Sequence, residues 1–255
     1  MATTLQKLRT LLRKRFGGVL ESGGHEENGK ACALELMSVY RGIPWTDKPQ
    51  SVRSFDLRPL NDIAVSNEAR TKHLLPVIAA YEGSLDWPVE RLKRVVDRLV
   101  ILTTQRIISD LPDTPKDLCE QCKSADTLEK CRSAVQVVHE AAARAADAYY
   151  IANAVSATIE FTHAIQSVLA RDIKRPRSII GRPLRRSRTR CAIYRNNYFS
   201  AANSVAASVD RSAAAAAYAH DVGVAVADHA AREKVFVTAC KLWVEAARKG
   251  RTKRS

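Results

Sequence analysis

The sequence predicts an all-α protein, and three observations lead to that prediction. Apolar residues recur at spacings of three and four along most of the chain, which is the period of an amphipathic helix. No segment alternates apolar and polar residues with the period of two that marks a strand. Alanine supplies much of the 46% hydrophobic content, and alanine has the strongest intrinsic helix propensity. We therefore expect a multi-helix array or bundle with alanine-rich C-terminal helices.

The first half of the chain contains the best-marked helices. The segment 4–16 is basic, lacks acidic residues and places leucines on one face, which predicts a helix docked on the core. A transit peptide or a helix lying on a membrane surface is the alternative interpretation of the same pattern. Further helices are expected over 30–40, 67–81 and 88–111. Pro76 should bend the helix over 67–81, because proline removes a backbone hydrogen bond and crowds the preceding turn.

The second half is predicted to contain longer and more uniform helices. A short helix is expected after Pro115 and a long one over 127–170, where neither proline nor glycine occurs. The segment 195–249 is alanine-rich helix with Gly223 as its break. We divide the chain into a helical region over 1–112, a long-helix region over 113–170, a basic loop or linker over 171–194 and alanine-rich helices over 195–255. These four regions can belong to one domain.

Polar and special residues concentrate in the segment 23–62. It contains Gly24-His25, Cys32-x-x-Glu35, Gly42-x-x-Trp45-Thr46-Asp47-x-Pro49 and Leu60-Asn61-Asp62. Over residues 1–110 this run resembles that of a family of alanine-rich helical proteins from actinobacteria and their phages. The resemblance implies a helical fold and a phage or actinobacterial setting, and it implies no reaction.

Four residues of this segment are candidates for catalysis: His25, Cys32, Glu35 and Asp47. A thiol at the start of a helix has a lowered pKa, and a nearby imidazole and carboxylate can activate it as a nucleophile or join it in binding a metal. The alternative is structural. Cys32 then packs in the core, Glu35 pairs with a nearby donor and Asp47 caps a helix. Spacing alone leaves both interpretations open.

A second group of candidates has the composition of a zinc site. Cys119-x-x-Cys122 has the spacing with which two thiolates bind one zinc ion, and Cys131 and His139 follow as possible third and fourth ligands. The downstream pair lacks the short spacing of a zinc finger. Cysteines three apart also occur on the buried face of a helix, and this is the alternative.

The segment 171–194 contains nine basic residues and one acidic residue, which accounts for +8 of the chain's net charge of +14. Its prolines and glycine prevent one continuous helix, so an exposed loop is expected. Guanidinium groups suit phosphate oxygens, which predicts binding of nucleic acid without sequence preference. The candidate binding residues are Arg175, Arg177, Arg182, Arg185, Arg186, Arg188 and Arg190. A solvated connection, or an arm that docks on an acidic protein or on a second copy of the chain, is the alternative.

From these features the sequence predicts a binding or interaction module, an accessory protein of a phage or an actinobacterium, with nucleic acid or an acidic protein as partner. Two alternatives stay open: a hydrolase-type enzyme that uses His25, Cys32 and Glu35, and a host-interaction or toxin-neutralising protein. We see no secretory signal and no apolar run of about 20 residues, so we expect a cytoplasmic protein without a membrane span. Six cysteines are too few for a disulfide scaffold in a chain of 255 residues.

Overall fold

The computed structural model describes residues 3–23, 29–46, 57–64, 66–111, 114–144, 201–209, 212 and 225–250. Every regular element within these residues is helical, which confirms the all-α prediction. The basic segment 171–194 and the break predicted at Gly223 lie outside the described residues.

Helix α1 (Thr4–Arg15) begins with a capping box. The hydroxyl of Thr3 accepts a hydrogen bond from the Gln6 N–H at 3.3 Å, and the Gln6 side chain accepts one from the Thr3 N–H at 2.8 Å. Two donors that a helix start leaves unpaired are thereby satisfied. Leu8 and Leu12 are buried, so the leucine face of α1 docks on the core as predicted.

Helices α2 (Ala33–Arg41) and α3 (Arg58–Asp62) follow. The end of α2 lies at Gly42, whose φ of 64° is in the left-handed region that glycine adopts without strain. The Ile43 N–H then binds the Ser38 carbonyl at 3.0 Å, which closes the last turn of the helix.

The helix predicted over 67–81 is present, with an irregular centre. It consists of α4 (Asn67–Ala69), a π-helical turn η2 (Arg70–Leu74) and α5 (Leu75–Tyr81). In a regular α-helix the ring of Pro76 would crowd the carbonyl four residues earlier. That carbonyl belongs to the wider π turn. The irregularity expected at Pro76 therefore takes the form of a π turn directly before the proline.

The helix predicted over 88–111 ends earlier than expected. Helix α6 spans Val89–Arg106, and a 3₁₀ turn, η4 (Ile108–Asp110), replaces its last turn. At Ile107 the backbone leaves helical geometry, with φ −122° and ψ −55°. Both Ile107 and Ile108 are buried, as are the consecutive pairs Val95–Val96 and Leu99–Val100 within α6, so the chain stays in contact with the core through the break.

Helices α7 (Lys116–Ser124) and α8 (Leu128–Arg144) form a hairpin joined by residues 125–127. Helix α7 follows Pro115 as predicted. Helix α8 coincides with the first part of the long helix expected over 127–170, and the remainder of that segment lies outside the described residues.

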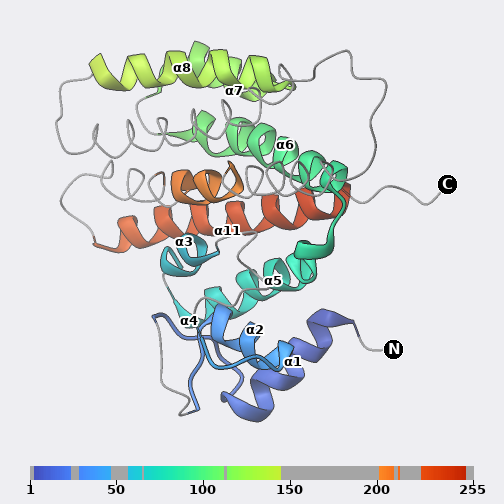
Figure 1. The fold of residues 1–255 in the computed structure, drawn as a ribbon. Coiled ribbons are helices and arrows are strands. Elements are labelled where there is room, and N and C mark those ends of the chain that lie inside the picture. Colours follow the sequence, from blue (N-terminus) through green and yellow to red (C-terminus); the bar gives the residue numbers. More distant parts are fainter. Residues whose placement is uncertain are drawn as a thin grey trace, which may run out of the picture.

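Helix α11 (Ala225–Lys249) lies at the centre of the molecule. It packs against α6 on one side and against α5 on the other. In Figure 1 the layers follow in the order α8 and α7, α6, α11, α5, and then α2 and α1. Residues 201–209 are also helical, and most of them are buried. The arrangement places the N-terminal helices at one end of the molecule and the α7–α8 hairpin at the other.

An aromatic group joins α11 to α5. Trp243 and Phe236 of α11 are the largest of the fully buried side chains that the structure describes. The Tyr81 hydroxyl donates a hydrogen bond to the Trp243 carbonyl at 3.1 Å, and the two rings are 5.2 Å apart. Burial raises the pKa of Tyr81 well above its usual value. Trp87 packs on Tyr81 at 5.6 Å, and the Arg91 guanidinium lies 3.6 Å from the centre of the Trp87 ring.

The end of α11 fits closely against α6. Arg94 donates a hydrogen bond to the Gly250 carbonyl at 3.3 Å. A Cβ atom built on Gly250 would lie 2.3 Å from Val95 Cγ2. The contact therefore requires glycine for steric reasons.

We predict that Gly250→Ala lowers the free energy of unfolding by about 1–3 kcal/mol, because an added methyl group overpacks this contact. Urea denaturation measures the effect. Val95→Ala provides the control, since it removes the atoms that the new methyl would meet. In the Val95→Ala background the Gly250→Ala substitution should cost less, and equal costs in both backgrounds would contradict the contact.

Candidate functional site

The first candidate residues, Cys32 and Glu35, meet at the start of α2. Cys32 is the residue that precedes the helix, and the Glu35 carboxylate accepts a hydrogen bond from the Cys32 N–H at 2.7 Å. Both residues are buried, with Glu35 only 1% exposed. Ser38 donates a hydrogen bond to the Glu35 carbonyl at 2.7 Å. This geometry is a capping box in which cysteine stands in the place that serine or threonine usually takes.

The Cys32 thiol has the opposite character from that expected of a nucleophile. Burial, with a contribution from the neighbouring Glu35 carboxylate, raises its pKa to about 12, although hydrogen bonds from backbone N–H groups oppose the shift. The thiolate is the reactive form of cysteine, so a thiol with this pKa is protonated at neutral pH. The lowered pKa expected at a helix start is therefore wrong for Cys32, because burial outweighs the helix terminus.

His25 and Asp47 lie outside the described residues, so their distance from Cys32 stays a prediction. Within the described part, Glu35 serves as a helix cap. The structural interpretation of Cys32 and Glu35 thus has direct support.

Arg70, a buried arginine that is not among the predicted candidates, connects several segments of this region by hydrogen bonds. Arg70 is 3% exposed and donates hydrogen bonds to the carbonyls of Asn61 at 3.1 Å and Ala64 at 3.2 Å, and to the side chain of Asn67 at 2.5 Å. Burial lowers the pKa of Arg70, and the negative charge of Asp62 opposes that shift. The guanidinium therefore links the Leu-Asn-Asp run to the π turn.

A sequence signal for this burial exists in retrospect. Arg70 lies four residues before Leu74 and eight before Ile78, on the apolar face of the predicted helix. A lone charged residue in such a stripe indicates a buried group with several partners.

We predict that Glu35→Ala lowers the free energy of unfolding by about 1–3 kcal/mol, because it leaves the buried Cys32 N–H without its acceptor. Glu35→Gln keeps an oxygen at this position and should cost less. Glu90, an exposed residue in the first turn of α6, provides a matched control in Glu90→Ala. Denaturation midpoints that are equal for Glu35→Ala and Glu90→Ala would argue against a structural role of the Glu35 cap.

The second candidate group, the three cysteines of α7 and α8, is largely buried. Cys119 directs its thiol to the Thr114 carbonyl at 3.5 Å, and Cys131 directs its thiol to the Ala125 carbonyl at 3.7 Å. Burial raises the pKa of Cys122 to about 12 and also raises that of Cys131. The thiols of Cys119 and Cys131 thus face backbone carbonyls, and the raised pKa values keep Cys122 and Cys131 protonated at neutral pH.

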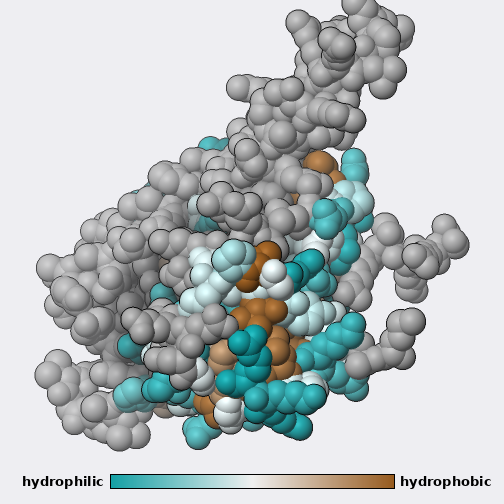
Figure 2. Space-filling view, turned by 60° about the horizontal axis from the view of Figure 1, so that its bottom comes forward, coloured by the Kyte–Doolittle hydropathy of each residue, from teal (hydrophilic) through white to brown (hydrophobic). Residues whose placement is uncertain are grey.

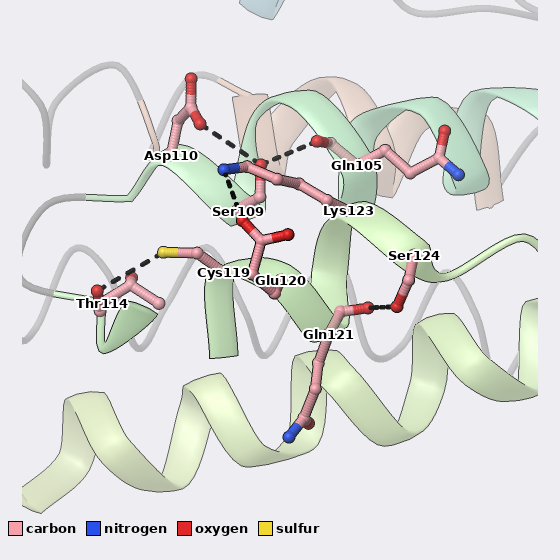
Figure 3. A network of polar contacts seen from close by, with 9 residues as sticks. All are labelled: Gln105, Ser109, Asp110, Thr114, Cys119, Glu120, Gln121, Lys123 and Ser124. Atoms are coloured by element: carbon pink, nitrogen blue, oxygen red, sulfur yellow. Dashed lines mark hydrogen bonds and ion pairs between the residues drawn. The ribbon is translucent and has the colours of Figure 1, made fainter. Parts of the chain in front are cut away.

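Figure 3 shows the polar contacts around Cys119. Lys123 pairs with Glu120 at 3.2 Å on the exposed side of α7, and Ser109 binds the Gln105 carbonyl at 2.7 Å near the end of α6. Each of these contacts pairs polar groups that lie close together in the sequence, and the side chains do not converge on a common binding site.

The fourth zinc candidate, His139, lies at a distance from Cys131. His139 follows Cys131 by eight residues on α8, which corresponds to about 12 Å along the helix axis. Across the residues that the structure describes, no group of three or more His, Cys, Asp and Glu side chains is placed to hold a metal ion. The zinc site of Cys119, Cys122, Cys131 and His139 stays a prediction.

Metal analysis of the purified protein tests it. If these residues bind zinc, the protein should contain about one equivalent, and a chelator should lower its melting temperature. A Cys119→Ser, Cys122→Ser double variant should lose the zinc. Cys240, a buried cysteine of α11, provides the control in Cys240→Ser, which should retain it. Metal-free protein whose melting is insensitive to chelator would exclude the site.

Charged side chains are unevenly distributed over the described surface. Glu245 of α11 pairs with Lys249 at 2.7 Å, Arg106 at 3.3 Å and Arg98 at 3.7 Å, which joins α11 to α6. The hydrogen bond from Lys249 lowers the pKa of Glu245, and Arg106 and Arg98 contribute. Further ion pairs join Lys30 to Glu21, Arg41 to Glu82, Lys93 to Asp97, Lys123 to Glu120, Lys130 to Asp126 and Lys234 to Asp110.

Helix α1 differs from the other helices in its charge. Its sequence contains no acidic residue. Lys7, Arg9, Arg13 and Lys14 are exposed and make no ion pair with any residue that the structure describes. We call these four residues the α1 cations. They make α1 the described surface with the clearest excess of unpaired positive charge.

Comparison with known protein families, with curated proteins and with solved structures finds no match to this chain. The resemblance to actinobacterial and phage proteins therefore stays a prediction. Within the described helices, none combines the length and the apolar character that crossing a membrane requires.

Proposed function

We propose that this protein binds nucleic acid through the phosphate backbone, without preference for base sequence. The observation that carries the proposal is the segregation of charge. Asp97 of α6, Glu120 of α7 and Glu245 of α11 are engaged in ion pairs, whereas the α1 cations have no such partners among the described residues. The segment 171–194 adds nine basic residues against one acidic residue. Positive charge that is not neutralised within the protein attracts polyanions.

The chemistry of the basic residues favours phosphate as the group that is bound. Most of the cations in 171–194 are arginines, whose planar guanidinium presents paired donors that match phosphate oxygens. Phosphate contacts position a protein on nucleic acid and carry no sequence information. Binding of this kind needs no recognition helix, and its affinity depends strongly on salt.

The hydrolase alternative receives no support from the described residues. Cys32 is protonated at neutral pH because its pKa is about 12, and the Glu35 carboxylate is occupied by a backbone N–H. A membrane-surface role for α1 is also disfavoured, since such helices insert an apolar face and the Leu8 and Leu12 face of α1 is buried in the core. An acidic protein is the partner that would compete with nucleic acid for the same cations.

We predict that replacing Arg185, Arg186, Arg188 and Arg190 by alanine weakens the salt dependence of nucleic-acid binding. Each phosphate neutralised on a duplex contributes about −0.9 to the slope of log K against log salt, so four contacts contribute about −3.6. Fluorescence anisotropy of a labelled duplex at several salt concentrations measures this slope.

The melting temperature serves as the control for folding and should not change. A slope equal to that of the wild type would place the contacts outside these four arginines. Failure of the wild type to bind at low salt would reject the proposed function.

A further inference from the structure

We infer that α1 is a rigid contact surface for the phosphates of double-stranded nucleic acid. This inference rests on the proposed function and goes further, because it names the binding helix and the form of the nucleic acid. Figure 2 shows the end of the molecule that carries α1, where hydrophilic side chains lie on both sides of an apolar strip. Three features of this surface favour a duplex: the spacing of the α1 cations, the rigidity of the helix and the burial of the aromatic rings beside it.

The α1 cations form two rows on the outward side of the helix. With 3.6 residues per turn, Arg9 and Arg13 lie along one edge of this side and Lys7 and Lys14 along the other, with the exposed Thr10 between the rows. The rows span about 6 Å and about 10 Å along the helix axis. One strand of a duplex carries a phosphate about every 3.4 Å along its axis, so each row can meet more than one phosphate.

The helix is fixed before any ligand binds. Leu8 is 0% exposed and Leu12 is 1% exposed, and the capping box at Thr3 and Gln6 closes the first turn. Helix α1 packs on α2 and α5. Binding therefore orders only the side chains of the cations, which reduces the entropic cost of association. A duplex is also rigid, so it can meet this fixed set of charges without being ordered, whereas a flexible single strand would lose conformational entropy on binding.

The aromatic rings beside α1 are buried or half-buried, which leaves little ring surface for base stacking. Phe16 is 4% exposed, the Arg15 guanidinium lies 5.7 Å from its ring centre, and Trp45 packs against it at 5.8 Å. Every Phe, Tyr and Trp side chain in the described part of the chain is buried or half-buried. Single-strand binding relies on stacking of bases on exposed rings, which contributes about 1–3 kcal/mol per base. The surface around α1 offers phosphate contacts and little ring surface for stacking, and this favours a duplex.

The test compares wild-type protein with a variant in which Lys7, Arg9, Arg13 and Lys14 are replaced by glutamine. Glutamine preserves helix propensity and length while removing the charge. The probes are a labelled DNA duplex of about 20 base pairs and one of its strands, titrated in anisotropy between about 50 and 200 mM salt. Wild-type protein should bind the duplex at least about tenfold more tightly than the strand. For the duplex, the slope of log K against log salt should be less negative in the variant by about 3.6. Between the two salt concentrations the wild type should therefore lose about 100-fold more affinity for the duplex than the variant does.

A matched control removes the same charge from the other end of the molecule. Lys116, Lys123, Lys130 and Arg132 are exposed on α7 and α8, and their replacement by glutamine should leave the slope close to that of the wild type. If the fourfold α1 variant does not fold, as judged by circular dichroism, the pair Arg9→Gln and Arg13→Gln should still reduce the slope by about 1.8.

Three outcomes would overturn the inference. Equal or tighter binding of the single strand would reject the preference for a duplex. Equal slopes in the α1 variant and the α7–α8 control would reject α1 as the contact surface. Both leave the proposed function in place if the wild type still binds nucleic acid with a strong salt dependence. Binding to phosphatidylserine vesicles, with no binding to either nucleic acid, would reject both the inference and the proposed function.

Discussion

The fold depends on the packing of α11 between α5 and α6. Trp243 and Phe236 fill the centre of this contact, and Tyr81 fixes α11 to α5 through a buried hydrogen bond to the Trp243 carbonyl. The remaining described helices attach to these three: α1 and α2 pack on α5, and α7 and α8 pack on α6. Without α11, the apolar faces of α5 and α6 that it covers would be open to water, so both ends of the molecule depend on it.

Polar residues inside the N-terminal half follow from the requirement that buried polar groups have partners. Glu35 accepts from the N–H that the start of α2 leaves unpaired, and Arg70 is surrounded by carbonyl and amide oxygens. Both groups hold irregular backbone in place. The segment 23–62 therefore resembles an active site in composition, although its described candidates, Cys32 and Glu35, have structural roles. The unpaired positive charge, by contrast, lies on the outer surface of α1, where it contributes nothing to the core.

Local signals predicted most of the described helices. The leucine spacing of α1, the glycine after α2 and the proline before α7 act within a few residues, and the structure places these elements as expected. The break at Ile107 was not predictable, because no proline or glycine between Pro88 and Pro112 marks it. The pKa of Cys32 was missed because burial is decided by tertiary packing rather than by neighbours in the sequence. The burial of Arg70 was missed although its place in the apolar stripe indicated it.

The hydrogen bond between Tyr81 and Trp243 spans 162 positions of the chain, and this separation has a consequence during synthesis. The ribosome completes α5 and α6 long before it adds the helix that covers them. At about 5–20 residues per second, the delay amounts to about 8–30 s. During that interval the exposed faces of α5 and α6 are open to aggregation or to chaperones, and the native core can close only after α11 has been synthesised. The faces of α5 and α6 that α11 covers therefore depend on a helix that the ribosome adds much later.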